Sequence, residues 1–395
     1  MTSSQPLIPI AKPVLGEEEA AAAREAILSG WVTQGPQAAA FEDEFARYVG
    51  APHACAVSSC TTALHLALHA LGVGPGDEVV TVSHSFIATA NAVTYCGARP
   101  VFVDIDPETY NLDPGLLETA ITPRTRAIMP VHQVGLPCDM PAILKIAGSH
   151  GLPVIEDAAC AIGSEIHRSP VWQRVGRPHG TVACFSFHPR KVITTGDGGM
   201  LTTRDPALDR KFRLLRQHAM SVPDRIRHEA RSLIFEEYPE VGFNYRMTDI
   251  QAAVGRVQLR RLPDLLAQRL ALADYYTQEL RRIPGLEPPV VPDYARPNYQ
   301  SYAVRVTADY PLTRDHLMQH LLNHGISSRR GIMNAHQEKA YAGGPHEYLP
   351  HSEAARDAVV LLPLYPGLTP EDQQRVIDLL ATPVPLGRVA ATVTC

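Results

Sequence analysis

Two ionisable residues follow neighbouring apolar runs of the chain. Asp157 ends the run PVIED, and Lys191 follows the run FSF after the turn HPR. A lysine amine can form a Schiff base with an aldehyde cofactor, and a carboxylate can keep a pyridine nitrogen protonated. A pyridoxal phosphate enzyme needs this pair of groups. A structural ion pair at a strand end explains the same two residues equally well.

A segment rich in hydroxyl side chains supplies a candidate anion site. In VSSCTTALHLALHALG (57–72), a strand pattern ends in serines and a helical pattern begins near Cys60 and Thr61. Backbone N–H groups at a helix start, together with hydroxyl groups, bind phosphate. An ordinary helix cap at Ser59 or Thr61 remains the alternative. The glycine-rich TTGDGG (194–199) suits a tight turn or a simple loop.

Three other patterns have simpler explanations than catalysis. GVGPG (72–76) precedes a strand pattern, so a turn is favoured over a dinucleotide-binding loop. VDID (103–106) resembles the metal-binding DxD of glycosyltransferases, but two acids after a buried strand are commoner as a solvated turn. His65 and His69 share a helix face, but no third ligand accompanies them. No metal is expected.

The scaffold for these residues is predicted from alternating apolar and helical stretches between residues 50 and 205. The expected strands are continuous apolar runs, as in strands buried on both faces. They lie at 55–59, 78–82, 100–106, 126–132, 153–159, 181–187 and 199–203. Strand–helix alternation of this kind predicts a mostly parallel sheet with helices on both faces. Ligands bind such sheets outside the carboxyl ends of the strands.

The remainder of the chain has a different pattern. A long amphipathic helix is predicted over 248–283, with Pro263 marking a kink or break. A strand at 301–306 and helices at 314–324 and 370–381 follow a proline-rich stretch. The sequence therefore predicts a large α/β domain over 1–265, including an N-terminal arm, and a smaller α+β domain over 266–395.

Composition narrows the function classes. The chain has 395 residues, of which 45% are hydrophobic and 19% charged, with 36 basic and 41 acidic side chains. It carries no basic stripe, so a nucleic-acid partner is not expected. The apolar runs are shorter than the roughly 20 residues of a membrane span, so no membrane partner is expected. No export leader is visible, and the seven cysteines form no CxxC pair. A reducing, cytoplasmic location is predicted.

The chain resembles the DegT/StrS-type sugar aminotransferases, a family within the fold-type I (aspartate aminotransferase-like) pyridoxal phosphate enzymes. The resemblance covers nearly the whole chain, more weakly over LPLYPGLTPEDQQRVIDLL (362–380). The main matching segments are SGWVTQGP (29–36), FEDEFARYVG (41–50), AVSSCTTALHLAL (56–68), GPGDEVVTVSHSFIATANAV (74–93), PVFVDIDPETYNLDP (100–114), PVHQVGLPCDM (130–140), VIEDAACAIGSE (154–165), CFSFHPRKVITTGDGGML (184–201) and GFNYRMTDIQAAVGRVQL (242–259). The fold it implies is a mostly parallel seven-stranded sheet with a smaller C-terminal α+β domain.

The resemblance assigns cofactor roles by position. Lys191 is the expected Schiff-base lysine and proton shuttle, and Asp157 the partner of the pyridinium nitrogen. The other implied cofactor contacts are Ser186 and the backbone of Cys60 and Thr61 at the phosphate, Asn244 from the partner subunit, His84 at the ring-stacking position, and Cys160.

Substrate contacts are expected from three further residues. His188 follows the family pattern FSFH, and His336 falls where the family often has a histidine near the substrate. Arg329 lies in the pair RR of GISSRRGIM, where guanidinium groups match the oxygens of a diphosphate. A solvated basic turn explains the arginines equally well on charge matching alone.

Two positions depart from the family pattern. Cys60 replaces a glycine of the phosphate loop, and Cys160 replaces a glutamine that packs near the cofactor. Both departures concern cofactor contacts. Lys191 is retained, whereas a related branch of dehydratases has histidine there, so transamination is favoured.

The function predicted from the sequence is that of a homodimeric pyridoxal phosphate aminotransferase with shared active sites. It would move an amino group from glutamate or glutamine to a keto-sugar, in particular a nucleotide-linked 4-keto or 3-keto hexose. A cyclitol (inosose-type) ketone is the alternative acceptor. The alternatives from other classes are a non-catalytic, cofactor-binding regulator of the same fold and a metal-dependent glycosyltransferase resting on VDID alone.

Overall fold

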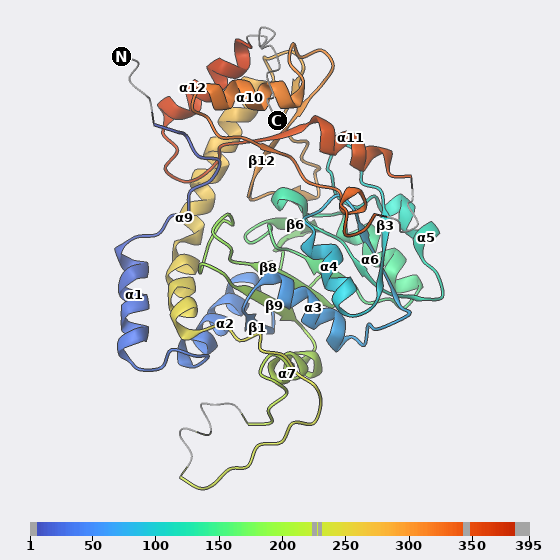
Figure 1. The fold of residues 1–395 in the computed structure, drawn as a ribbon, viewed down its shortest axis with the longest axis vertical. Helices are drawn as coiled ribbons and strands as arrows, with labels where there is room; N and C mark the ends of the chain where they lie inside the picture. The colour runs from blue at the N-terminus through green and yellow to red at the C-terminus, as the bar shows by residue number, and fades with distance from the viewer. Residues whose placement is uncertain (1–5, 223–226, 228–230, 343–347, 384–395) are drawn as a thin grey trace, which may run out of the picture.

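A seven-stranded sheet forms the centre of the computed structural model (Figure 1), which describes residues 6–222, 227, 231–342 and 348–383. Across the sheet the strands are β1 (His53–Val57), β9 (Gly199–Thr203), β8 (Val182–Ser186), β5 (Ile155–Asp157), β4 (Thr125–Met129), β2 (Glu78–Val82) and β3 (Arg99–Val103). Parallel bridges from Ile128 to Val154 and from Val131 to Asp157 join the β4 side to the β5 side. Only β9 pairs antiparallel to both neighbours. The predicted fold class is confirmed.

Both faces of the sheet are covered, because alternate residues of each strand enter different apolar cores. Cys55 and Val57 pack with α3 (Cys60–Ala70), α4 (Ala88–Tyr95) and α7 (Pro206–Leu215). Ala54 and Ala56 pack into the core on the other face. That core is built with α2 (Pro36–Val49), α5 (Leu117–Ala120), α6 (Met140–Ser149) and the first half of α9 (Asp249–Leu280). The continuous apolar runs of the sequence arise from this double burial.

Helix α9 is unbroken over 32 residues and connects the lower and upper parts of the molecule in Figure 1. Thr248 caps it by accepting the N–H of Gln251 at 3.2 Å. Pro263 lies inside the helix, so of the predicted kink or break the break is wrong, and the kink stays a prediction. Leu259, Leu262 and Leu265 are buried on either side of it, and this packing outweighs one lost backbone hydrogen bond. Helix α1 (Glu17–Leu28) packs along α9.

The C-terminal part is a second layer around the upper half of α9. Its sheet has the order β10 (Leu286–Glu287), β12 (Tyr302–Val306), β14 (Val359–Leu362), β13 (Arg329–Arg330), with helices α10 (Arg314–Asn323), α11 (Pro350–Ala358) and α12 (Pro370–Ala381). Ile8 of the N-terminal arm is buried in this core. Because α9 crosses residue 265 without interruption, the division at 265/266 stays a prediction.

A small sheet that the sequence pattern did not predict lies between the two parts. It consists of the hairpin β6 (Glu165–Arg168) and β7 (Val171–Arg174) with β11 (Ala295–Arg296). The part of the chain that the structure describes also has three short 3₁₀ turns: η1 (Pro114–Leu116), η2 (Gln133–Gly135) and η3 (Ala335–Gln337). None of the helices in the described ranges is long and apolar enough to cross a membrane.

Candidate active site

Lys191 and Asp157 lie at the same edge of the sheet, beyond the carboxyl ends of β8 and β5. These two strands are parallel neighbours, with Asp157 opposite Cys184. Asp157 is only 4% exposed. The Nζ atom of Lys191 lies 3.0 Å from the Sγ atom of Cys160, which follows β5. The fold therefore brings the amine, the carboxylate and the thiol to one place.

In this cluster a buried acid lies near a half-buried base. Burial raises the pKa of Asp157, although hydrogen bonds from Thr89 and Ala159 and the charge of Lys191 act in the opposite direction. For Lys191, burial lowers the pKa, but the neighbouring Cys160, Cys60 and Asp157 outweigh it and the net shift is upward. The site favours a charged amine and concentrates polar groups in an apolar surrounding, as functional sites do.

Thr89 is a site residue that the sequence prediction missed. Its hydroxyl, in the first turn of α4, donates to Oδ2 of Asp157 at 2.8 Å. The Oγ atom of Ser85 lies 2.8 Å from that of Thr89, and the N–H of Ala159 donates to the other oxygen of Asp157 at 3.2 Å. The segment FIATANAV contributed to the family resemblance without a role for its threonine, because 68 positions separate Thr89 from Asp157.

The start of α3 has the form of an anion site. Ser59 is the helix cap, accepting the N–H of Thr62 at 3.2 Å. Helix geometry then leaves the first N–H groups, those of Cys60 and Thr61, without intrahelical partners. Gly199 lies against this turn so closely that a Cβ atom there would be 2.4 Å from the carbonyl oxygen of Ser59.

Ser186 lies beside the same turn. It is opposite Gly199 in the β8–β9 pairing, and Gly199 is opposite Val57 in the β1–β9 pairing. The last residues of β1 and β8 therefore meet at the start of α3. A hydroxyl and free N–H groups at this point form a donor set that suits a phosphate group.

The Cys60 side chain, which stands where glycine was expected, is accommodated by burial. It is 8% exposed and belongs to the apolar core around α3. Burial, followed by the charge of Asp157, raises the pKa of the thiol well above its usual value. Cys60 therefore acts here as a small neutral core residue, and its backbone N–H remains available.

His84 does not offer an open ring face. It is 1% exposed, its ring Nδ1 lies 2.7 Å from Oδ1 of Asn334, and burial lowers its pKa to about 4. The prediction that His84 stacks on the cofactor is therefore not supported by the structure. Phe86, two residues later, is 71% exposed and lies next to Ser85, which is linked through Thr89 to Asp157. Phe86 is the aromatic ring that is free to stack.

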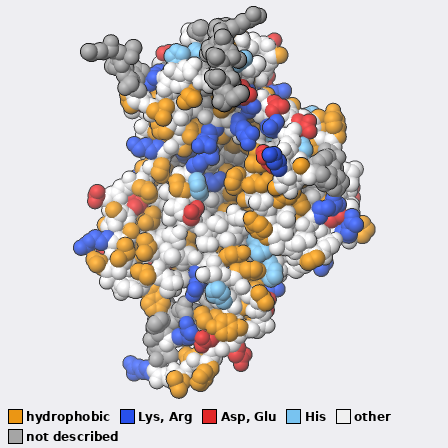
Figure 2. Space-filling view, in the orientation of Figure 1, with side chains coloured by type: hydrophobic (Ala, Val, Ile, Leu, Met, Phe, Trp, Pro, Cys, Tyr) orange, Lys and Arg blue, Asp and Glu red, His pale blue; other side chains and the backbone are white. Residues whose placement is uncertain are grey.

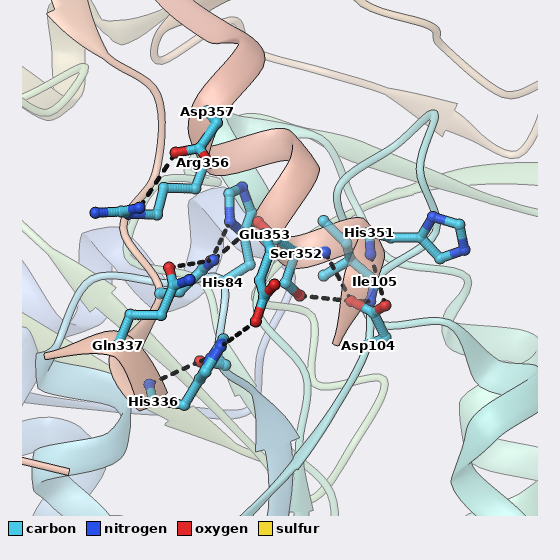
Figure 3. Close-up of polar contacts among 12 residues, drawn as sticks. His84, Asp104, Ile105, His336, Gln337, His351, Ser352, Glu353, Arg356 and Asp357 are labelled. Atoms are coloured by element: carbon cyan, nitrogen blue, oxygen red, sulfur yellow. Dashed lines mark hydrogen bonds and ion pairs between the residues drawn. The ribbon is translucent and has the colours of Figure 1, made fainter. Parts of the chain in front are cut away.

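His336 lies in a polar network between the end of β2 and the C-terminal part (Figure 3). Its Nδ1 atom is 2.6 Å from Oγ of Ser83, and its Nε2 atom is 3.2 Å from Oε1 of Glu353. Both ring nitrogens are thus engaged within the protein. Ser83 has no exposed surface, so this Ser–His–Glu arrangement cannot act as a hydrolytic nucleophile on a substrate.

Three basic side chains lie near the Lys191 turn. His188 is exposed, and its Nδ1 atom accepts the N–H of Arg190 at 3.2 Å. Burial and then the like charge of Arg329 lower the pKa of Arg190. Arg190 was not singled out from the sequence. Figure 2 shows Lys and Arg side chains gathered around a hollow between the upper and lower parts of this face.

Asn244 is exposed on the loop that follows the segment 231–241. The helix cap after this loop is Thr248, so Asn244 does not cap α9. The loop lies against the end of β1, where the N–H of Ser58 donates to the carbonyl oxygen of Tyr245 at 2.8 Å. The structure describes a single chain, and the prediction that Asn244 reaches a partner's site stays a prediction.

The acids of VDID have structural partners. Asp104 accepts hydrogen bonds from the N–H groups of His351 and Ser352 and from the Ser352 hydroxyl, and so fixes the start of α11 (Figure 3). Asp106 accepts three hydrogen bonds from Glu108 and Thr109. Within the described residues, no group of three or more His, Cys, Asp or Glu side chains could hold a metal ion.

Comparisons with known proteins identify the family of the chain. The model of the DegT/DnrJ/EryC1/StrS aminotransferase family matches residues 13–381, and the chain belongs to this family of pyridoxal phosphate-dependent aminotransferases. GDP-perosamine synthase of Caulobacter vibrioides is 44% identical over 96% of this chain and 98% of its own. The spore coat polysaccharide biosynthesis protein SpsC of Bacillus subtilis is 40% identical over 94% of this chain and 95% of its own. The crystal structure of DesV of S. venezuelae with a ketimine intermediate superposes with a TM-score of 0.84 at 36% identity, covering 95% of this chain and 98% of that one.

Proposed function

We propose that this sugar aminotransferase transfers an amino group from glutamate or glutamine to a nucleotide-linked 4-keto or 3-keto hexose. The observation that carries the proposal is the convergence of Lys191, Asp157 and the N-terminus of α3 at one edge of the sheet. The nucleotide-linked acceptor is supported by the name of the GDP-perosamine synthase, which covers 96% of the chain. An inosose-type cyclitol ketone remains the alternative acceptor.

The residues present fit pyridoxal phosphate. Lys191 would carry the cofactor covalently, Asp157 would face its ring nitrogen, and Phe86 would cover its ring. The N–H groups of Cys60 and Thr61 and the hydroxyl of Ser186 would bind its phosphate. Cys160 would lie beside Lys191, at the Sγ–Nζ contact of 3.0 Å. A regulator that only bound the cofactor would not need to keep both Lys191 and Asp157.

The chain's own groups then perform the proton chemistry. Pyridoxal phosphate, when bound, supplies an electron sink and carries the amino group between donor and acceptor. Lys191 Nζ would be the group that accepts and returns a proton during the transfer, since it is the amine of the site. Asp157 would face the ring nitrogen, and the hydrogen bonds that Thr89 and Ala159 donate to its two oxygens favour its charged form.

Substrate binding is proposed for the basic residues at the mouth of the site. Arg190 and Arg329 would bind the anionic diphosphate or the donor carboxylate, since guanidinium groups match both. His188 would contribute a hydrogen bond through its Nε2 atom. His336 would act through Ser83 and Glu353, which already occupy its ring nitrogens, and would shape the site without touching the sugar.

We also propose that the protein is a homodimer with shared active sites and that it is located in the cytoplasm. The loop that leads to Asn244 carries Leu233, Phe235 and Val241, which are at least 84% exposed in the single chain. A contiguous exposed apolar segment of this kind is typical of a protein interface. A second copy packed on this loop would place Asn244 near the partner's phosphate site.

Spectra of the bound cofactor test the proposed reaction. The purified protein is expected to absorb as a lysine-bound pyridoxal phosphate, to lose that absorbance with glutamate or glutamine, and to regain it with the correct keto-sugar. A panel of nucleotide-linked 3-keto and 4-keto hexoses and inososes identifies the acceptor. Protein that cannot be loaded with pyridoxal phosphate would contradict the proposed function. If only inososes restored the absorbance, the acceptor would be a cyclitol ketone and not a nucleotide-linked hexose.

Mixed dimers test the proposed role of Asn244. An amide donor to a phosphate forms a charge-assisted hydrogen bond of about 1.5–3 kcal/mol, so Asn244→Ala is expected to weaken cofactor binding roughly tenfold to a hundredfold. When Lys191→Ala and Asn244→Ala subunits are combined, one site collects both defects and the other is intact. The hybrid should therefore be more active than either parent at limiting cofactor. Activity no higher than that of the Asn244→Ala parent would place Asn244 in its own subunit's site or outside the site.

A further inference from the structure

We infer that Asn298 and Gln300 are positioning residues that hold the loops of Lys191 and Cys160 together. The inference rests on the proposed role of Lys191 in catalysis. Both residues lie between β11 and β12. They are 1% and 8% exposed, so water does not compete for their amide groups.

Asn298 holds the loop that carries Cys160. Its Nδ2 atom donates to the carbonyl oxygens of Cys160 and Ile162, each at 2.8 Å. Its own N–H donates to the hydroxyl of Ser164 at 3.1 Å. One side chain thus satisfies two buried carbonyl groups of a segment that has no strand or helix partner. The main chain at Cys160 is therefore restrained from the C-terminal side of the molecule.

Gln300 holds the turn that carries Lys191. Its Nε2 atom donates at 2.7 Å to the carbonyl oxygen of Arg190, the peptide group that precedes Lys191. Its N–H donates at 2.8 Å to Oδ1 of Asn298. The backbone of Gln300 is thus bonded to the side chain of Asn298, and the two residues together link the main chain before Lys191 to the main chain at Cys160.

The pair is anchored to α9 by a buried arginine. Arg269 is 5% exposed and donates to the carbonyl oxygens of Tyr299, at 3.1 and 2.9 Å, and of Gln300, at 2.6 Å. Burial lowers the pKa of this guanidinium to about 10. Burying a cation against carbonyl oxygens alone is costly. A purely stabilising contact could be made by an apolar side chain, so this arrangement favours a positioning role.

Gly135 provides the space that Asn298 occupies. Its φ of +94° is a conformation that side chains disfavour, and a Cβ atom there would be 1.9 Å from Oδ1 of Asn298. Its carbonyl oxygen accepts the Ser164 hydroxyl at 2.7 Å. The 130–140 segment, the Cys160 loop and the Asn298–Gln300 segment are therefore fitted to one another at this point.

Two variants remove the donors with little change in volume. Asn298→Asp keeps the oxygen that accepts the Gln300 N–H but loses both donated bonds, and Gln300→Met loses its one side-chain donor. Gln373→Met is the matched control. Gln373 is 3% exposed and donates through Nε2 to the carbonyl oxygen of Leu272 at 2.7 Å, between α12 and α9. All three changes leave one or more buried carbonyls unpaired, so all three are expected to lower the melting temperature.

The distance between amine and thiol is measured directly in cofactor-free protein. o-Phthalaldehyde condenses with an adjacent amine and thiol, losing two water molecules, to give a fluorescent isoindole. We expect Asn298→Asp and Gln300→Met to form the Lys191–Cys160 product about tenfold more slowly than the wild type, since a shift of about 1 Å can cost as much as a hundredfold between oriented groups. Gln373→Met should match the wild type, Cys160→Ser should give no product, and peptide mapping assigns the two residues.

A second readout uses loaded enzyme. The rate constant for reaction of bound cofactor with glutamate should fall about tenfold in both variants, while the glutamate concentration at half-saturation stays unchanged. If both variants match Gln373→Met in isoindole formation and in this rate constant, the positioning role is wrong. If Asn298→Asp does not fold, Gln300→Met and the milder Gln300→Asn decide the outcome. Wild-type protein that takes up no pyridoxal phosphate would overturn the proposed function, and the isoindole measurement would still test the two amides.

Discussion

Lys191→Ala is expected to lower amino-group transfer by at least about a thousandfold, because it removes both the covalent anchor and the proton carrier. The hydrogen-bond partner of the Nζ atom is the thiol of Cys160, at 3.0 Å. Borohydride treatment of the wild type should fix the cofactor mass on the peptide that contains Lys191. The variant should retain bound but removable cofactor, and should complete neither half-reaction.

Lys145→Ala is the control for this substitution. Lys145 is an exposed lysine of α6, and its loss should leave the rate and the labelled peptide unchanged. Transfer by Lys191→Ala at the wild-type rate, or borohydride labelling of another lysine in the wild type, would show that Lys191 is not the catalytic amine.

Asp157→Asn is expected to reduce the rate roughly a hundredfold to a few thousandfold. The amide keeps the size of the side chain but removes its negative charge, so a protonated ring nitrogen would be left buried without its counter-ion. Breaking a buried charge pair costs about 3–5 kcal/mol, which converts to this range of rates. Single-turnover rates with glutamate measure the effect, and the spectrum of the bound cofactor reports whether binding is retained. A variant within threefold of the wild type would show that Asp157 does not balance a ring charge.

Thr89→Val measures how much of the catalytic role of Asp157 depends on its hydrogen bond from Thr89. The substitution preserves shape and removes the hydrogen bond of 2.8 Å to Oδ2 of Asp157, so a smaller loss of about tenfold is expected. Thr94 lies on the same helix and donates to the carbonyl oxygen of Ala90 at 3.2 Å. Thr94→Val is therefore the matched control and should leave the rate unchanged. Equal effects of the two substitutions would assign the loss to α4 and not to Asp157.

Much of the scaffold could be predicted from the sequence because it depends on local patterns. The runs EVVTV and GMLTT are strands β2 and β9 at the predicted residues, and the last predicted helix is α12 at 370–381. Strands that are buried on both faces must be apolar at every position, and such a run can be recognised within one short segment of sequence. The unbroken α9 was not predictable from Pro263, since long-range packing of its leucines decides whether a proline interrupts a helix.

Some residues of the candidate cofactor site could also be predicted from local sequence, whereas others depended on long-range packing. Lys191 and Asp157 were identified because Asp157 ends its strand and Lys191 lies in the turn after the next one, and the chemistry of the pair is specific. Phe86 could have been found in the matching segment SHSFIATANAV, but only the burial of His84 shows which of the two rings is free. His84 is held in its buried position by a hydrogen bond to Asn334, which lies 250 positions away in the sequence.

By itself, the sequence determined the strand–helix alternation, the amine and carboxylate at the strand ends, and the family to which the chain belongs. Each of these is encoded within a few consecutive residues. The tertiary structure decided which groups surround the amine and the carboxylate. Thr89 donates a hydrogen bond to Asp157, and Cys160 contacts Lys191. Asn298 and Gln300 donate to the main chain at Cys160 and at Arg190. The Gln300–Arg190 hydrogen bond joins residues 110 positions apart. Such contacts form because buried polar groups need hydrogen-bond partners, and only the packed fold brings partners from distant segments together.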